Sequence, residues 1–173
     1  MKYSTVLIIM GVMFLQGCKT ENYVDKTTVK NVDINKYLGK WYEIARYEHY
    51  FEKDLEGVTA NYSLMDDGMI RVQNAGYKDS LGGKYKEIIG KARKKKGEGS
   101  GELEVSFFWI FYSDYKILEL ASDYSYALIG SESDDYLWIL SRTPKMKRDD
   151  LDFLLRRIEE RGYDTNQLYW VEQ

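Results

Sequence analysis

The sequence is poor in the side chains that enzymes most often use for covalent or metal chemistry. Among its 173 residues there is one cysteine, Cys18, and one histidine, His49. A single cysteine excludes an intramolecular disulfide framework. Without a second histidine or cysteine the usual zinc and copper ligand sets cannot form, and a catalytic triad lacks a base beside a nucleophile. We therefore expect no metal, no cofactor and no catalytic residue.

Proline and strong net charge are also scarce. Pro144 is the only proline, which argues against a long disordered linker. The formal net charge is −3 and the isoelectric point is near 5.4. This balance argues against a general nucleic-acid binder, so we expect no nucleic-acid partner.

The sequence also lacks a hydrophobic run long enough for an ordinary transmembrane helix. The longest uncharged stretch near the start is residues 6–15 (VLIIMGVMFL), whereas spanning a bilayer takes about 20 apolar residues. With Lys2 before it, this stretch has the length of a signal-peptide hydrophobic core. The next residues, 15–18 (LQGC), resemble the bacterial lipobox, in which cleavage leaves a lipid-modified cysteine at the new N-terminus. The alternative is a chance cysteine after an ordinary signal peptide.

These features predict three segments. Residues 1–17 are expected to be a cleaved signal peptide. Residues 18–32 are expected to be the lipidated Cys18 and a polar tether, because the stretch after the cysteine is polar and aperiodic. Residues 33–173 then form a single domain, long enough to bury a sizeable core.

Beyond residue 33 the chain repeats a pattern of strand and turn. Period-two segments rich in Tyr, Val, Ile, Phe and Trp are separated by turn residues such as Asp66-Asp67-Gly68. Eight successive strands in short hairpins favour an all-β, antiparallel up-and-down barrel, because closure removes exposed edges. A sandwich with a helix on one face fits the same pattern. The expected strands are residues 40–48, 58–65, 70–78, 85–93, 103–109, 115–120, 126–131 and 136–141.

The period then changes from two to that of a helix. Leu151, Leu154, Leu155 and Ile158 fall at i, i+3, i+4 and i+7, which predicts one apolar stripe on a C-terminal α-helix. A short final strand is expected at residues 168–171.

Two segments carry a family resemblance. Residues 37–46 (YLGKWYEIAR) resemble the first signature of lipocalins, a Gly-x-Trp that opens the first strand, and residues 136–144 (YLWILSRTP) match a later strand in the expected order. The resemblance covers residues 33–171 and is closest to the bacterial outer-membrane lipoprotein branch, with apolipoprotein D as an animal relative. One departure is Ala121, which stands where the family usually has an aspartate; Asp123 is the nearest substitute.

The resemblance implies a structural role for three residues. Trp41 is expected to plug one end of the barrel, and Arg142 to stack across its indole in a cation–π contact. Gly39 is expected to let the backbone enter the barrel without a side-chain clash.

Strand parity then predicts which side chains face the interior. If Arg142 faces inward, alternation places further side chains of its strand inside as well, and the resemblance adds inward positions on other strands. An interior filled by these side chains, without room for a ligand, is the alternative. The expected ligand-binding residues are Tyr62, Val72, Asn74, Phe107, Trp138 and Leu140.

Charged residues at the ends of the strands suggest membrane or headgroup contacts. Arg46, His49 and Lys53 are expected at the open end, where they could meet a phosphate or carboxylate headgroup. The basic run at residues 91–96 is read as a solvated hairpin tip, with attraction to an anionic membrane as the alternative.

The function implied is that of a membrane-anchored lipocalin that stores or transports fatty acids or lysophospholipids in the bacterial cell envelope. Lys19 is not the aspartate that retains enteric lipoproteins at the inner membrane, which favours the outer membrane. Two alternatives remain open: an interaction module that forms a homodimer through the outside of the barrel, and an enzyme that reduces lipid hydroperoxides through an exposed methionine, the candidates being Met65, Met69 and Met146.

Overall fold

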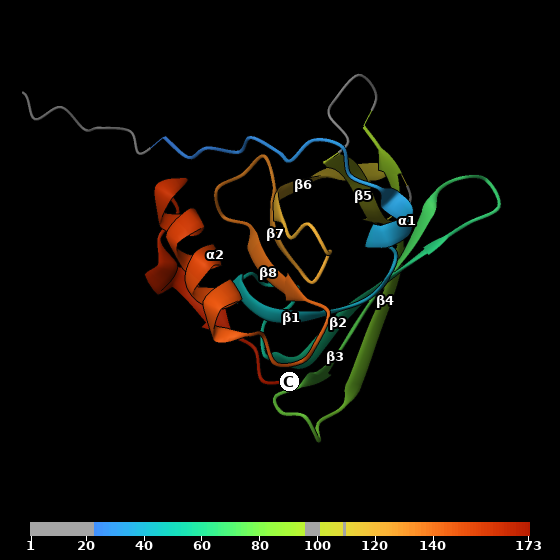
Figure 1. Ribbon diagram of the computed structural model, residues 1–173. Coiled ribbons are helices and arrows are strands. Elements are labelled where there is room, and N and C mark those ends of the chain that lie inside the picture. The colour runs from blue at the N-terminus through green and yellow to red at the C-terminus, as the bar shows by residue number, and fades with distance from the viewer. Residues whose placement is uncertain (1–22, 96–100, 109) are drawn as a thin grey trace, which may run out of the picture.

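The computed structural model describes residues 23–95, 101–108 and 110–173 (Figure 1). Its core is one antiparallel sheet that closes on itself. Its elements are α1 (Ile34–Tyr37), β1 (Gly39–Tyr47), β2 (Leu55–Leu64), β3 (Ile70–Lys78), β4 (Tyr85–Lys94), β5 (Glu102–Phe108), β6 (Phe111–Leu120), β7 (Tyr126–Gly130), β8 (Leu137–Ser141), α2 (Arg148–Glu160), the 3-10 turn η1 (Thr165–Gln167) and β9 (Leu168–Trp170).

Each strand from β2 to β7 pairs with the next in the sequence, and β1 closes the barrel by pairing with both β2 and β8. The register sets Trp41 opposite Ala60, and Tyr62 opposite Val72. The ninth strand, β9, pairs with the last three residues of β1, with Leu168 opposite Tyr47. The expected eight-stranded antiparallel barrel with a C-terminal helix and a short final strand is confirmed.

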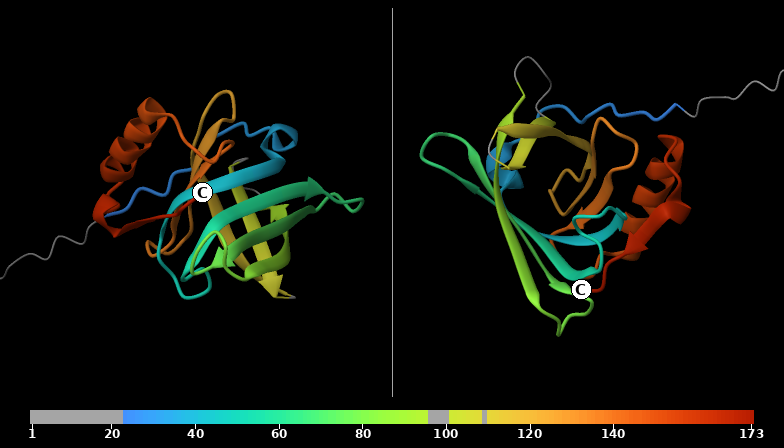
Figure 2. Two further views of the ribbon diagram at one scale, coloured as in Figure 1. Left: turned by 90° about the horizontal axis from the view of Figure 1, so that it is seen from below. Right: turned by 180° about the vertical axis from the view of Figure 1, so that it is seen from behind.

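The two ends of the barrel differ. α1 and the β2–β3 turn lie at the end where β1 begins, here called the closed end. The β1–β2, β3–β4, β5–β6 and β7–β8 connections lie at the other, open end. In the left view of Figure 2, α1 lies towards the top, whereas the β1–β2 loop and the end of β5 lie towards the bottom.

A bulge in β1 changes which side chains face inward. The register against β8 shifts between Glu43 and Ala45. A bulge adds one residue to a strand and so reverses the alternation beyond it. Ala45 and Tyr47 therefore pack outward in the cluster beneath α2. Arg46 faces the opposite way and is fully buried.

The helix α2 covers one side of the barrel (Figure 1). Its stripe buries Leu154 and Ile158 completely, against Ala45, Leu128 and Ile139 on the outer face of β1, β7 and β8. Each such buried aliphatic side chain contributes about 1.5–3 kcal/mol relative to exposure, which explains why the sequence keeps the helical period there.

The strand bounds agree with the sequence prediction to within a few residues, and β3 matches it at both ends. The sequence prediction missed α1 and η1, since helices of three or four residues carry no apolar period. α1 begins because the Asp33 carboxylate accepts from the Asn35 backbone N–H at 3.0 Å. Within the described residues, no helix is long and apolar enough to cross a membrane.

Candidate functional site

The closed end is sealed by Trp41. Its side chain is fully buried, and its indole N–H donates to the Tyr37 carbonyl at 2.9 Å. The Arg142 guanidinium carbon lies 3.9 Å from the centroid of the Trp41 ring. Planar stacking of this kind combines a cation–π contact with freedom for the guanidinium edges to form hydrogen bonds.

Those edges tie Arg142 to the segments around it. The guanidinium donates to the backbone carbonyls of Lys36 at 2.7 Å and of Lys40 at 3.0 Å. It also donates to the Tyr124 carbonyl at 3.3 Å. The substitute acid suggested by the sequence, Asp123, accepts from the Ser125 backbone N–H instead, and so shapes the β6–β7 turn.

Gly39 is required for a reason other than the expected one. Its φ is +94°, a conformation that side chains rarely adopt, and an added Cβ would lie 3.4 Å from Arg142 Nη1, an ordinary contact. The backbone turn between α1 and β1, more than space in the barrel, selects glycine.

Inside the barrel, the predicted lining residues come together. Tyr62, Val72 and Leu140 are buried in one interior cluster that also contains Trp41. Phe107 and Trp138 pack against this cluster but keep part of their surface accessible. The same is true of the small residues Ala60 and Val105 of β2 and β5.

Asn74 is the polar member of the lining set. It lies opposite Ala60 on β2, and therefore on the inward face. Its side-chain oxygen is buried and has no hydrogen-bond partner among the described residues. A buried unpartnered acceptor costs about 1–3 kcal/mol, so a donor or a water molecule is expected there.

Three tyrosines, whose contact the sequence analysis did not predict, form a hydrogen-bonded chain in the barrel towards its closed end. The hydroxyl of Tyr115 lies 2.6 Å from that of Tyr37 and 3.0 Å from that of Tyr62. Burial raises the pKa of Tyr62 to about 12 and the pKa of Tyr115 well above its ordinary value. All three hydroxyls therefore stay neutral over the physiological range and act as polar but uncharged lining.

At the open end, the structure does not place Arg46 where the sequence predicted. Arg46 is buried inside the barrel, and its guanidinium donates to the Glu43 carboxylate at 2.8 Å. It also donates to the Glu52 backbone carbonyl at 2.8 Å and stacks over the Tyr169 ring. The bulge in β1 is the cause, and this cation is not available at the rim.

His49 and Glu52 lie on the loop that follows β1, at the open end next to the ion pair of Arg46 and Glu43. The Glu52 carboxylate accepts from the Trp138 indole N–H at 3.0 Å and lies 3.1 Å from His49 Nε2. The His49 ring stacks on Phe51, with centroids 3.8 Å apart, and is 5.3 Å from Trp138. His49 is thus part of an aromatic layer across the mouth. Lys53 alone of the three predicted rim residues is exposed.

Carboxylates outnumber cations in this buried group. Burial, followed by repulsion from Glu52, raises the pKa of Glu43 well above its ordinary value, although Arg46 opposes the shift. A third buried acid, Glu56, accepts from the Tyr169 hydroxyl and the Glu172 backbone N–H. The mouth therefore does not present the cationic headgroup site that the sequence suggested.

The remaining sequence candidates lie away from the interior or outside the described residues. Cys18 and the predicted signal peptide lie outside them. Met65 and Met69 flank the closed-end β2–β3 turn, and Met146 packs against the cluster beneath α2. In the part of the chain that the structure describes, no group of three or more His, Cys, Asp or Glu side chains could hold a metal ion.

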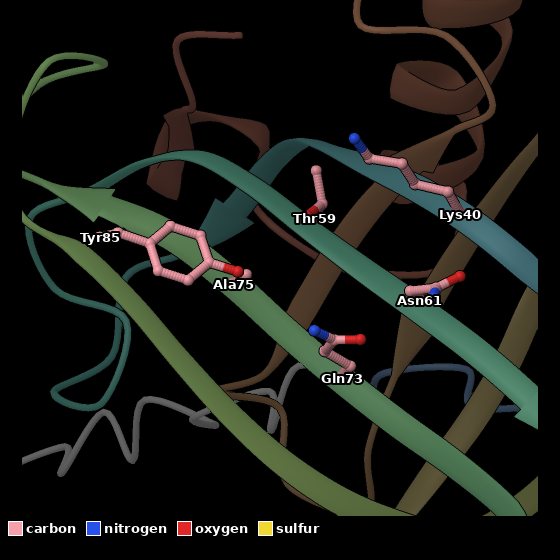
Figure 3. Close-up of a pocket in the computed structure, with 6 residues that line it drawn as sticks. All are labelled: Lys40, Thr59, Asn61, Gln73, Ala75 and Tyr85. Carbon is pink, nitrogen blue, oxygen red and sulfur yellow. The ribbon is translucent and has the colours of Figure 1, made fainter.

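A shallow hollow of about 250 Å³ lies on the outer face of the barrel (Figure 3). Register explains its position, because Asn61 and Gln73 are paired and point away from the inward Tyr62 and Val72. It is separate from the interior cluster. Its lining consists of Lys40, Thr59, Asn61, Gln73, Ala75 and Tyr85.

A closed antiparallel barrel, plugged by tryptophan and arginine at one end and flanked by one helix, defines a lipocalin-type barrel. A family model described as a lipocalin-like domain matches residues 32–173. An outer membrane lipoprotein named Blc from Vibrio cholerae is 43% identical over 169 residues, covering 97% of this chain and 98% of that one. Mouse apolipoprotein D is 31% identical, with coverage of 83% and 78%.

Solved structures agree on the fold. Insecticyanin from the tobacco hornworm Manduca sexta superposes with a TM-score of 0.72 at 17% identity, covering 87% of this chain and 86% of that one. The chain belongs to the lipocalin family, as the sequence resemblance predicted.

Proposed function

We propose that this lipocalin binds the acyl chain of a fatty acid, lysophospholipid or similar lipid inside its barrel, and stores or transports it in the bacterial envelope. The observation that carries the proposal is the incomplete burial of inward side chains. Ala60, Val105, Phe107 and Trp138 pack on the interior cluster yet remain partly accessible. An acyl chain against them would remove this apolar surface from water, at about 25 cal/mol per Å².

The interior also supports selection by shape more than by charge. Towards the closed end the interior is lined by neutral tyrosine hydroxyls, and Asn74 offers one unpartnered acceptor. Apolar area distinguishes poorly between acyl chains of similar length, so tolerance among lipids is expected.

The proposal includes an anchor. Acylation at Cys18, after removal of residues 1–17, would hold the domain at the membrane, and the relatives named outer membrane lipoproteins support the outer membrane as its site. Two acyl signals or more give stable attachment, whereas one chain binds reversibly.

Native mass spectrometry of the mature chain, purified in mild detergent, tests the ligand. The expected result is a population heavier by the mass of a fatty acid or lysophospholipid, which decreases when Trp138→Ala removes part of the lining. A bare protein that also ignores added lipid would contradict the proposal and favour an interaction role on the outside of the barrel.

A further inference from the structure

Large apolar side chains gather around the open end. At the β5–β6 hairpin, Phe108, Ile110 and Phe111 are 71%, 73% and 76% exposed. The other open-end connections add more, and together they form what we call the apolar rim. The rim comprises Tyr50, Phe51, Leu81, Tyr85, Phe108, Ile110 and Phe111, all exposed.

The closed end differs. Among the described residues there, Leu64 and Met65 are the exposed large hydrophobics. The described part of the basic run, residues 91–95, also lies towards this end, where Arg93 pairs with Glu104 at 2.7 Å and Lys95 with Asp114 at 3.0 Å. Cations in ion pairs attract a membrane less than free cations do. Docking through apolar contact would turn the open end towards the bilayer, whereas docking through the basic run would turn the closed end towards it.

The start of the described chain lies on the side of the open end. The backbone N–H of Asp25 donates to the Arg161 carbonyl at 2.8 Å, where α2 ends. Lys26 forms an ion pair with Asp134 of the β7–β8 connection at 2.6 Å. From there the chain runs to α1 at the closed end (Figure 1).

This position fixes what an anchor at Cys18 could reach. Tyr23 is five positions after Cys18, and five Cα–Cα steps span at most about 18 Å when fully extended. An acyl anchor would therefore hold the open end of the barrel close to the bilayer.

We infer that the apolar rim is a membrane-docking surface, which presses the mouth of the barrel against the lipid layer so that a lipid passes between bilayer and barrel. The inference rests on the proposed anchor at Cys18. Charges of both signs, such as Lys53, Lys84, Glu48 and Asp79, surround the rim. Docking is therefore driven by apolar contact, and it needs neither anionic lipid nor low salt.

The test uses the mature, acylated chain in phosphatidylcholine vesicles that contain a nitroxide-labelled lipid. One variant carries a fluorophore on Phe111→Cys and the matched control carries it on Leu64→Cys, an exposed site at the closed end. Because a nine-residue strand spans about 30 Å, quenching at position 111 is expected to exceed that at position 64 by about threefold or more. Equal quenching, or more at position 64, would overturn the inference.

A second variant tests the apolar rim without a fluorescent label. Phe108→Ser/Phe111→Ser is expected to slow lipid transfer from the protein to neutral vesicles by about tenfold, since two exposed rings are lost from the contact. Native mass spectrometry of the same variant should still show bound lipid. Transfer at the unchanged rate would contradict docking by the rim.

Failure of the anchor and failure of the docking surface look different. Absence of acyl mass on the mature chain would remove the anchor, and with it this inference. An anchored, lipid-loaded chain with no preferential quenching at position 111 would overturn the docking surface alone. Disulfide formation between two copies of Phe111→Cys, without lipid quenching, would assign the rim to a dimer contact instead.

Discussion

Arg142 and Trp41 form the seal of the barrel: the guanidinium carbon lies 3.9 Å from the indole centroid, over a ring that is fully buried. The same guanidinium donates to carbonyls of α1, of β1 and of the β6–β7 turn. One side chain therefore joins two regions that are far apart in the sequence, the α1–β1 segment and the β6–β7 turn.

Arg142→Lys is expected to destabilise the fold by about 2–3 kcal/mol, because an ammonium group cannot stack on the indole and reach several carbonyls at once. Urea denaturation of the two proteins at neutral pH measures the difference. A lysine variant with the midpoint of the wild type would show that charge alone holds the closed end.

Glu43 makes the stability depend on pH. Its pKa in the folded state is raised by burial and by Glu52, above the ordinary 4.5. The stabilising contribution of the neutral acid is therefore complete below about pH 4.5 and is lost as the pH rises through the folded-state pKa.

Glu43→Gln, which keeps an acceptor for Arg46, should accordingly match the wild type near pH 4 and exceed its melting temperature at pH 8. Thermal unfolding followed by circular dichroism at both values gives the comparison. If glutamine lowers the melting temperature more at pH 8 than at pH 4, the ion pair with Arg46 outweighs desolvation and the reasoning is wrong.

The carboxylates at the mouth predict a headgroup effect opposite to the one expected from the sequence. Glu52→Gln should strengthen binding of a fatty-acid anion by about fivefold, since it removes a negative charge near the entrance while keeping an acceptor for the Trp138 indole N–H. Competition with a fluorescent fatty acid measures it, and an uncharged monoacylglycerol serves as control. Lys53→Gln should change both affinities by less than about twofold, as an exposed charge does.

If Glu52→Gln increased the affinity for the uncharged lipid as much as the affinity for the fatty acid, Glu52 would act through packing and not through its charge. A large loss for fatty acids alone in Lys53→Gln would restore the cationic rim proposed from the sequence.

Much of the fold could be predicted because its signals are local. Period-two alternation located the strands, and parity from Arg142 correctly placed Leu140 and Trp138 towards the interior. The Gly-x-Trp segment located the closed end, since the positive φ of Gly39 and the burial of Trp41 both belong to one short stretch.

The mouth could not be predicted because it depends on a bulge and on distant contacts. Unbroken alternation from Trp41 turns Arg46 outward, and only the register shift after Glu43 brings it inside. Likewise, the contact between Tyr37 and Tyr115 requires α1 to fold beneath the barrel, a long-range arrangement that no strand pattern contains.

The central claim, that lipid occupies the interior, is tested most directly by filling it. Ala60→Phe adds a ring towards the interior of β2, whereas Thr59→Phe adds the same ring one residue earlier, into the shallow outer hollow. Native mass spectrometry after incubation with palmitate should show bound lipid on the Thr59→Phe protein and about tenfold less on the Ala60→Phe protein. Circular dichroism spectra of both variants should show that they are folded. Equal occupancy of the two variants would contradict an interior site and place the lipid outside the barrel.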